Sequence, residues 1–384
     1  MLKNNLSFAL LVCLLILNCE SGEESNTSGE ESYSVEEIDG IRHVHNITPA
    51  WGDEPKVSLE FVRKIGGMDK TDENYILFNP RDILIDDEDN IYVLDTGNFR
   101  IQKYDSDLNY LRTIGRQGQG PGEFDRTRQF HFDKDGNIVI NDYRNRRFVF
   151  FSKEGESVKT VRVIGRFMDF SFLESGDFIT WGNYDAFAWR PGPGFENASL
   201  LIIFDLEGNL VRGFGKVKKY SDYGAIFDGN NIRQTVWKDN NIYVMYFRQN
   251  KIEKYRPDGT LIFTASRELN YELDGVTAES PNGEKYLRLP TVSFTFGVDG
   301  KGRIWVKTYI KQPDDWEEPV DPSKERERPT LDHYKLEVFD NDGNLLGNLE
   351  CPVDFNIMRI CEDRIFLIDN AIEQCICEYK IVEK

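Results

Sequence analysis

Two acidic turns in this sequence have side chains at the spacing of calcium ligands. The segments 133–137 (DKDGN) and 340–344 (DNDGN) place carboxylate or amide groups at alternate positions, as the first half of a calcium-binding loop does. Neither segment continues with the glycine at the sixth position and the glutamate at the twelfth that such a loop uses. Asp, Asn and Gly are also the residues that tight hairpin turns prefer. The sequence therefore predicts hairpin turns here and no metal site.

Other signals of catalytic chemistry are missing from the sequence. A zinc centre would have to gather three of only four histidines from distant segments. The sequence has neither the G-x-S-x-G turn that exposes a serine nucleophile nor the glycine-rich loop that holds nucleotide phosphates. We therefore predict no catalytic residue and no cofactor. The histidines are His43, His45, His131 and His333.

The cysteines near the C-terminus could stabilise that end of the chain. In an oxidising compartment the four of them could form disulfides, for which three pairings exist, and the sequence does not select among them. Free thiols are an alternative, and a zinc site is a third that a lone Cys-x-Cys motif supports only weakly. The four residues are Cys351, Cys361, Cys375 and Cys377.

The elements that must position these residues form an internal repeat. Each of six copies starts with a short strand and a polar turn, and continues with a second, nearly continuous apolar strand and then a third strand. In five copies a tight turn leads to a fourth strand. A repeat of this length and strand content is typical of a propeller. The first strands and their turns read DILIDDEDN, QFHFDKDGN, FSFLESGD, QTVWKDNN, FTFGVDGKG and IMRICED.

The sixth copy ends without a fourth strand, and this gap predicts how the ring closes. Residues 57–66 (VSLEFVRKIG) resemble the fourth strands of the other copies and precede the first complete copy. By completing the last blade they would remove a free sheet edge. We therefore predict an all-β, six-bladed propeller of four-stranded antiparallel blades, closed by Val57–Gly66, with almost no helix.

The N-terminus has the pattern of an export signal. Lys3 precedes an apolar run over residues 8–17 that is too short to span a bilayer. The sequence Ile-Leu-Asn-Cys that ends at Cys19 resembles a lipoprotein signal, in which this cysteine receives lipid; an ordinary cleaved signal is the alternative. We predict a signal peptide over residues 1–18, a flexible acidic tether over 19–40 and a propeller over 41–384.

The acidic run after Cys19 resembles the surface-export signals of some lipoproteins, and plain linker composition explains it equally well. We expect an outer-membrane lipoprotein of the cell envelope, either periplasmic or surface-exposed, that reaches the membrane through its lipid alone. Because the protein has a net charge of −19 and a pI near 4.8, we do not expect nucleic acid as a partner. The protein is expected to be monomeric.

The first repeat carries a specific family resemblance. Residues 90–93 (NIYV), 95–98 (DTGN), 100–104 (RIQKY) and 118–124 (GQGPGEF) resemble the NHL repeat of six-bladed propellers, and the chain as a whole resembles six-bladed propeller lipoproteins of Gram-negative bacteria. The resemblance implies the fold. It leaves the activity open, because such propellers include binding modules, RNA-binding proteins and a few enzymes.

One face of the ring is expected to bind a ligand. In propellers the loops between second and third strands and the loops between blades lie on the same face, where binding commonly evolves. Aromatic and charged side chains there could recognise a protein, peptide or glycan, although many could instead pack between blades. The alternatives are a metal-assisted lactonase-like or lyase-like enzyme and a structural subunit of an envelope complex. The candidate residues are Asp95, Arg100, Arg128, Asp142, Arg144, Trp181, Tyr184, Trp189, Tyr246, Arg248, Lys307 and Asp369.

Overall fold

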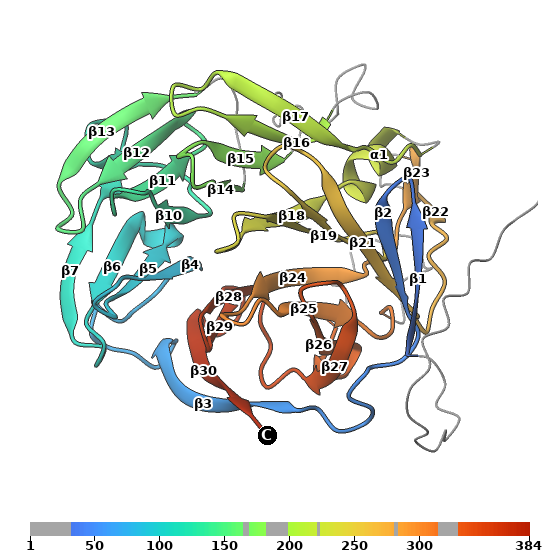
Figure 1. Cartoon of the computed structure of the whole chain (residues 1–384). Coiled ribbons are helices and arrows are strands. Elements are labelled where there is room, and N and C mark those ends of the chain that lie inside the picture. Colours follow the sequence, from blue (N-terminus) through green and yellow to red (C-terminus); the bar gives the residue numbers. More distant parts are fainter. Residues whose placement is uncertain (1–31, 164–168, 182–198, 221–222, 280–282, 314–328) are drawn as a thin grey trace, which may run out of the picture. The chain divides into compact units, whose positions relative to one another are not determined.

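The computed structural model describes residues 32–163, 169–181, 199–220, 223–279, 283–313 and 329–384. In these ranges the chain forms six blades, each built on four antiparallel strands, which follow one another in chain order around a ring (Figure 1). The predicted all-β, six-bladed propeller is confirmed. The predicted signal peptide and the predicted lipid attachment at Cys19 concern residues outside the described ranges.

Blades one to three contain four strands each, ordered from the centre of the ring outward. Blade one consists of β4 (Pro80–Ile85), β5 (Ile91–Asp95), β6 (Arg100–Tyr104) and β7 (Tyr110–Ile114). Blade two consists of β10 (Phe130–Phe132), β11 (Ile138–Asp142), β12 (Arg147–Phe151) and β13 (Ser157–Arg162). Blade three consists of β14 (Phe170–Phe172), β15 (Phe178–Trp181), β16 (Ser199–Phe204) and β17 (Leu210–Lys216).

Blades four to six continue the pattern and take up the N-terminal strands. Blade four has β18 (Ile232–Val236), β19 (Ile242–Tyr246), β20 (Ile252–Tyr255) and β21 (Leu261–Arg267). Blade five has β24 (Ser293–Val298), β25 (Ile304–Tyr309), β26 (Tyr334–Phe339) and β27 (Leu345–Glu350). Blade six has β28 (Ile357–Cys361), β29 (Arg364–Asp369), β30 (Cys375–Glu383) and β3 (Val57–Gly66).

Ring closure occurs as the sequence predicts. β3 pairs antiparallel with β30 from Val57 opposite Glu383 to Gly66 opposite Cys375. Figure 1 shows β3, in blue, beside β30, in red, in this blade. Because β3 covers the outer edge of β30, the last blade presents no unfinished third strand to solvent.

An N-terminal hairpin adds two further strands to blade four. β1 (Tyr33–Ile38) and β2 (Ile41–Asn46) pair with each other, and β2 pairs in parallel with β21. The prediction of a tether that extends to residue 40 is therefore wrong for residues 33–40. The segment Tyr33-Ser-Val-Glu-Glu-Ile has polar residues typical of a linker, but its backbone pairs with β2, which in turn pairs with the edge of β21, and this makes it part of a sheet.

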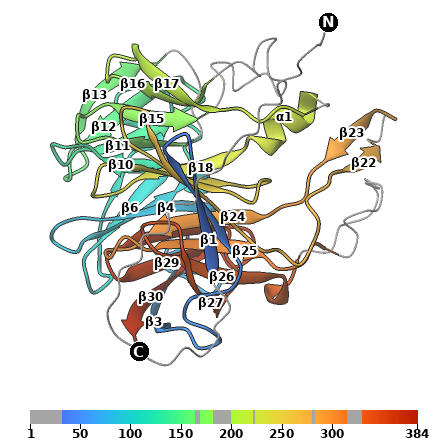
Figure 2. The ribbon, with the colours of Figure 1, turned by 45° about the vertical axis from the view of Figure 1, so that its right-hand side comes forward.

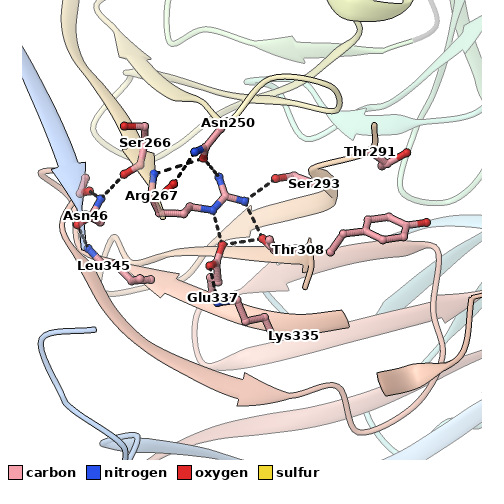
Figure 3. Close-up of polar contacts among 12 residues, drawn as sticks. Asn46, Asn250, Ser266, Arg267, Thr291, Ser293, Thr308, Lys335, Glu337 and Leu345 are labelled. Atoms are coloured by element: carbon pink, nitrogen blue, oxygen red, sulfur yellow. Dashed lines mark hydrogen bonds and ion pairs between the residues drawn. The ribbon is translucent and has the colours of Figure 1, made fainter. Parts of the chain in front are cut away.

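The N-terminal strap, which we define as residues 41–66, forms hydrogen bonds with three consecutive blades. The buried amide of Asn46 donates to the Ser266 and Gly343 carbonyls (2.9 and 3.0 Å) and accepts from the Leu345 N–H (2.6 Å), linking blades four and five (Figure 3). The N–H groups of the next segment, at residues 50 and 51, donate to β27 carbonyls. The strap then becomes β3 in blade six.

A buried ion pair crosses the seam between blades four and five. The Arg267 Nε lies 2.7 Å from the Glu337 carboxylate, and both side chains are almost completely buried. Figure 3 shows the Arg267 guanidinium surrounded by acceptors from Asn250, Ser293 and Thr308. Thr308 in turn donates to Glu337 (2.6 Å). The charges of this cluster are paired within the protein, and the cluster therefore has a structural role.

The hairpin turns take the predicted form. Asp133 accepts hydrogen bonds from the N–H groups of Asp135 and Asn137 (3.0 and 2.8 Å), and its other oxygen accepts from the Asn137 side chain. The segment 340–344 repeats the same three bonds. Both segments are turns closed by their own aspartate, which confirms the prediction from their residue types.

The core lies between neighbouring blades, and the second strands are its most buried elements. Every residue of β5, β11, β19 and β25 is buried, as their nearly continuous apolar sequences predict. One cluster, for example, packs Tyr92 and Leu94 of blade one against Phe130 and Ile140 of blade two. Such packing on both faces makes the blades a stiff frame for the loops and the channel.

Several short elements lie between the blades. The hairpin β22 (Val276–Glu279) and β23 (Lys285–Arg288) extends away from the blades (Figure 2). The near absence of helix is confirmed: α1 (Tyr223–Gly229) and two single-turn 3-10 helices, at Thr96–Asn98 and Leu331–His333, are short. None of the helices in the described ranges is long and apolar enough to cross a membrane. β8 (Arg116–Gln117) and β9 (Glu123–Phe124) form a small parallel pair.

Candidate binding site in the axial channel

A cavity of about 320 Å³ lies on the axis of the ring. Side chains from the first strands of all six blades line it: β4, β10, β14, β18, β24 and β28. Because each blade adds an even number of antiparallel strands before the next begins, all six first strands run in the same direction. Their starts therefore meet at one end of the channel and their ends at the other.

The two ends of the channel differ in chemistry. Charged or amide residues lie near the starts of four first strands, in β4, β10, β14 and β18, and β28 has an arginine at its centre. The last residues of these strands are mainly apolar or aromatic. The polar residues are Arg81, Asp82, Arg128, Gln129, His131, Asp169, Arg233, Gln234 and Arg359. The apolar lining includes Ile85, Phe132, Phe172, Trp237 and Val298.

One ion pair joins three blades at this channel. The Arg359 Nε donates to the Asp82 carboxylate at 2.5 Å. The other Asp82 oxygen accepts from the Phe130 N–H at 3.2 Å, so the pair links β28, β4 and β10. Burial, the largest single effect, lowers the pKa of Arg359, but the charge and hydrogen bond of Asp82 together with the charge of Asp169 outweigh it, so the pKa is raised. This arginine is charged and has its counter-ion within the protein.

A second, looser pair lies between blades three and four. The Arg233 Nη1 is 3.7 Å from the Asp169 carboxylate, which is longer than a hydrogen bond. Asp169 is almost fully buried, and within the described ranges neither of its oxygens has a hydrogen-bond donor. Burial raises the pKa of Asp169 and lowers the pKa of Arg233. The Arg233 charge and the nearby Gln129 side chain partly offset the effect of burial on the Asp169 pKa, but no described residue makes a hydrogen bond of standard geometry to this carboxylate.

Two further arginines have no counter-ion. Among the described residues, Arg81 and Arg128 form neither a hydrogen bond nor an ion pair, and both side chains are half-buried. Burial, together with the nearby charges of Arg128 and Arg233, lowers the pKa of Arg81 to about 10, which leaves it protonated at neutral pH. The four arginines here face only two aspartates, Asp82 and Asp169. This end of the channel is cationic.

Two neutral side chains complete the polar lining. His131 has a buried Nε2 with no described hydrogen-bond partner, and burial lowers its pKa to about 4, so the ring is neutral at physiological pH. The Gln234 side chain donates to the Ile179 carbonyl (3.3 Å), but its Oε1 is buried without a described donor. The site can therefore bind an anion through its arginines. It can also accept hydrogen bonds from a ligand through these two side chains.

The described residues contain no group of three or more His, Cys, Asp or Glu side chains arranged to hold a metal ion. Asp95, Asp142 and Asp369 end the second strands of their blades and do not line the axial cavity.

Four of the predicted face residues belong to, or lie beside, a repeated structural motif. Asp95 is buried, accepts from the Phe78 N–H (2.7 Å) and pairs with Arg100 (2.8 Å), which also donates to two carbonyls of the preceding loop. Asp142 repeats this pattern with the Asp125 N–H (3.1 Å) and with an arginine five residues later. The common spacing is Asp-x-x-Asn-x-Arg. In both blades it ties the loop after the second strand to the loop that enters the blade. Arg144 lies within the second copy, exposed and paired with Asp125 (3.0 Å).

Other predicted residues are engaged inside the blades. Tyr246 is fully buried and donates to Glu253 (2.6 Å). Lys307 is buried, donates to the Phe355 carbonyl (2.7 Å) and lies over three aromatic rings. Asp369 accepts from three N–H groups of the loop that follows it. These side chains were expected on an exposed face, but the fold buries them.

The remaining predicted residues differ in position. Trp181 is half-buried against the core between blades three and four. Arg248 pairs with Asp228 (2.9 Å). Tyr184 and Trp189 lie outside the described ranges. Of the predicted residues that the structure describes, only Arg128 belongs to the cationic end of the channel.

Sequence reasoning missed most of this site. It overlooked Arg81, Asp82, Asp169, Arg233 and Arg359. The available signal was a charged residue in or just before the first strand of several repeats, where the other residues are mainly apolar.

All four described cysteines are free thiols. Three of them, Cys351, Cys375 and Cys377, are buried in the core of blade six. A hydrogen bond from Cys375 lowers the pKa of the Cys377 thiol.

Comparison with known proteins supports the fold. The model of the DUF5128 family, described as a 6-bladed beta-propeller, matches residues 70–255. No curated protein matches the sequence. A protein from Bacteroides fragilis, named as a candidate exported protein, aligns with a TM-score of 0.58 at 12% identity, over 89% of this chain and 99% of its own. A DUF4221 member from Bacteroides vulgatus aligns with a TM-score of 0.58 at 9% identity, over 86% of this chain and 99% of its own.

Enzymes also occur among the solved structures with a similar ring. Virginiamycin B lyase from Staphylococcus aureus aligns with a TM-score of 0.44 at 8% identity, over 85% of this chain and 100% of its own. At these identities the likeness concerns the propeller fold alone.

Proposed function

We propose that this protein is a binding module that takes an anionic group into the cationic end of its axial channel. The observation that carries the proposal is the pair Arg81 and Arg128, two guanidinium groups without a described partner. They do not line the cavity of about 320 Å³ themselves, but Arg128 precedes the lining residue Gln129, and the charge of the lining residue Arg233 acts on Arg81. Guanidinium groups bind carboxylate, sulfate or phosphate through two parallel hydrogen bonds. A ligand anion would supply the counter-charge that the described part of the chain does not.

We further propose that the module acts in the cell envelope, attached through lipid on Cys19. The support is the N-terminal sequence, with its short apolar run and the cysteine that ends it. The Bacteroides fragilis neighbour is likewise named as a candidate exported protein, which agrees with this location. The partner presenting the anion would then be a protein, peptide or glycan of that compartment.

The test is calorimetric titration of the full-length chain in detergent with acetate, citrate and sulfate. We expect saturable binding of at least one anion, and we expect Arg128→Gln to weaken it about tenfold or more. Arg144→Gln is the matched control, because Arg144 is exposed and already paired with Asp125. If no anion binds, or if both variants lose binding equally, the channel is not the site.

A further inference from the structure

The axial cavity offers a ligand more than positive charge. Asp169 Oδ1, Asp169 Oδ2 and Gln234 Oε1 are buried acceptors without a described donor, and His131 Nε2 is a buried ring nitrogen without a described partner. All three residues line the cavity. Buried polar atoms are nearly always hydrogen-bonded in folded proteins, so four such atoms around one cavity call for a ligand that donates hydrogen bonds.

The charge of the site decides what kind of donor fits. An ammonium group could donate to Asp169, but it would stand near the guanidinium groups of Arg81, Arg128, Arg233 and Arg359. Like charges in a buried site repel strongly. A hydroxyl group donates without carrying charge. The donors of the ligand are therefore uncharged, as hydroxyls are, and its charged group is the anion that the arginines bind.

The opposite half of the cavity sets a further requirement. Phe132, Phe172 and Trp237 line it with aromatic surface. Aromatic rings cover the apolar C–H face of a saturated ring well, while polar groups at the edges fix its orientation. A volume of about 320 Å³ is near the lower end for ligand pockets, which suits one such ring rather than a long chain.

Resting on the proposed function, we infer that the cavity binds an acidic sugar, a hexuronate-type residue either free or at the end of a glycan. Its carboxylate lies against Arg81 and Arg128. Its hydroxyls donate to Asp169 and Gln234. One C–H face of its ring packs on the aromatic half of the cavity.

The experiment is titration of the full-length chain in detergent with glucuronate, galacturonate, glucose, glutamate and acetate. We expect at least one uronate to bind about tenfold or more tightly than acetate, with glucose undetectable and glutamate no tighter than acetate. We expect Asp169→Asn to weaken uronate binding about tenfold and to leave acetate binding unchanged or tighter. Asp125→Asn, at an ion pair outside the channel, is the control and should change neither.

The outcomes separate the two proposals. If acetate or sulfate binds and neither uronate binds more tightly, the acidic-sugar inference is wrong and the anion-binding function stands. If no anion of any kind binds, both are wrong. Should Asp169→Asn fail to fold, the comparison of uronate, glucose and acetate on the unaltered chain still decides between these outcomes.

Discussion

The Arg267 guanidinium is a buried cation balanced by one carboxylate, that of Glu337 across the seam between blades four and five. Replacing Arg267 by Met would leave this carboxylate buried without its main counter-charge. We expect a loss of about 3–5 kcal/mol in the free energy of unfolding, measured by chemical denaturation. Arg212→Met, at an exposed strand, is the control and should change it by about 0.5 kcal/mol or less.

The double variant Arg267→Met with Glu337→Leu tests the cause. Removing both charges leaves no uncompensated ion, so we expect it to be more stable than Arg267→Met alone. If the double variant loses as much free energy of unfolding as the two single variants together, packing rather than charge compensation makes this seam sensitive to substitution.

His131 makes the stability of the protein depend on pH. Burial lowers its pKa to about 4, below the ordinary value of about 6.5, so the unfolded chain takes up a proton before the folded chain does. The free energy of unfolding therefore falls as pH decreases from about 6.5 to about 4, by up to about 3 kcal/mol from this group. Thermal unfolding across this range should show a flatter profile for His131→Gln than for the control His43→Gln. An unchanged slope in His131→Gln would contradict the assignment.

At the scale of elements, Asn46 holds the N-terminal strap to two blades. Asn46→Ala removes three hydrogen bonds and leaves a buried N–H and two carbonyls without this partner. We expect a loss of about 2–3 kcal/mol in the free energy of unfolding. We also expect faster amide hydrogen exchange in β1 and β2.

Ser34→Ala, at an exposed position of β1, is the control and should leave exchange in the hairpin unchanged. Equal exchange in β1 and β2 for Asn46→Ala and the unaltered chain would show that backbone pairing with β21 suffices to hold the hairpin.

The blades could be predicted because their signals are local. A nearly continuous apolar second strand, an Asp–Asn turn and a fixed order of strands recur in each repeat, and the missing fourth strand of the last repeat predicts β3 as its partner. The Asp-x-x-Asn-x-Arg motif is local too. Its spacing is visible at Asp95 and Asp142, and only its buried, structural role had to come from the fold.

The parts that the sequence did not predict depend on contacts between distant residues. β2 becomes a strand because the edge of β21, more than two hundred positions later, is free to pair with it. The channel site depends on the parallel alignment of first strands, which brings Arg81, Arg128 and Arg233 together from three repeats. No pattern within a single repeat identifies these residues as neighbours.

The molecule as a whole combines an acidic composition with a cationic channel end. A net charge of −19 opposes the approach of an extended polyanion such as nucleic acid. A single carboxylate inside the channel, however, interacts mainly with the arginines near it, because other charges on the protein are screened beyond about 10 Å at ordinary ionic strength. This combination favours a small anionic group over a long acidic polymer.

Attachment of the whole molecule to a membrane is expected to depend on one residue of the N-terminal segment, Cys19. Burial of acyl chains contributes about 0.8 kcal/mol per methylene, so a diacylated chain should remain in the membrane fraction and enter detergent on phase separation. Cys19→Ser should abolish labelling with an alkyne fatty acid and move the protein to the aqueous phase. Cys13→Ser, within the apolar run, is the control and should keep both the fatty-acid labelling and the partition into detergent. If Cys19→Ser instead partitions like the unaltered chain, the N-terminal segment is not a lipoprotein signal, and another feature of the chain must account for any membrane association.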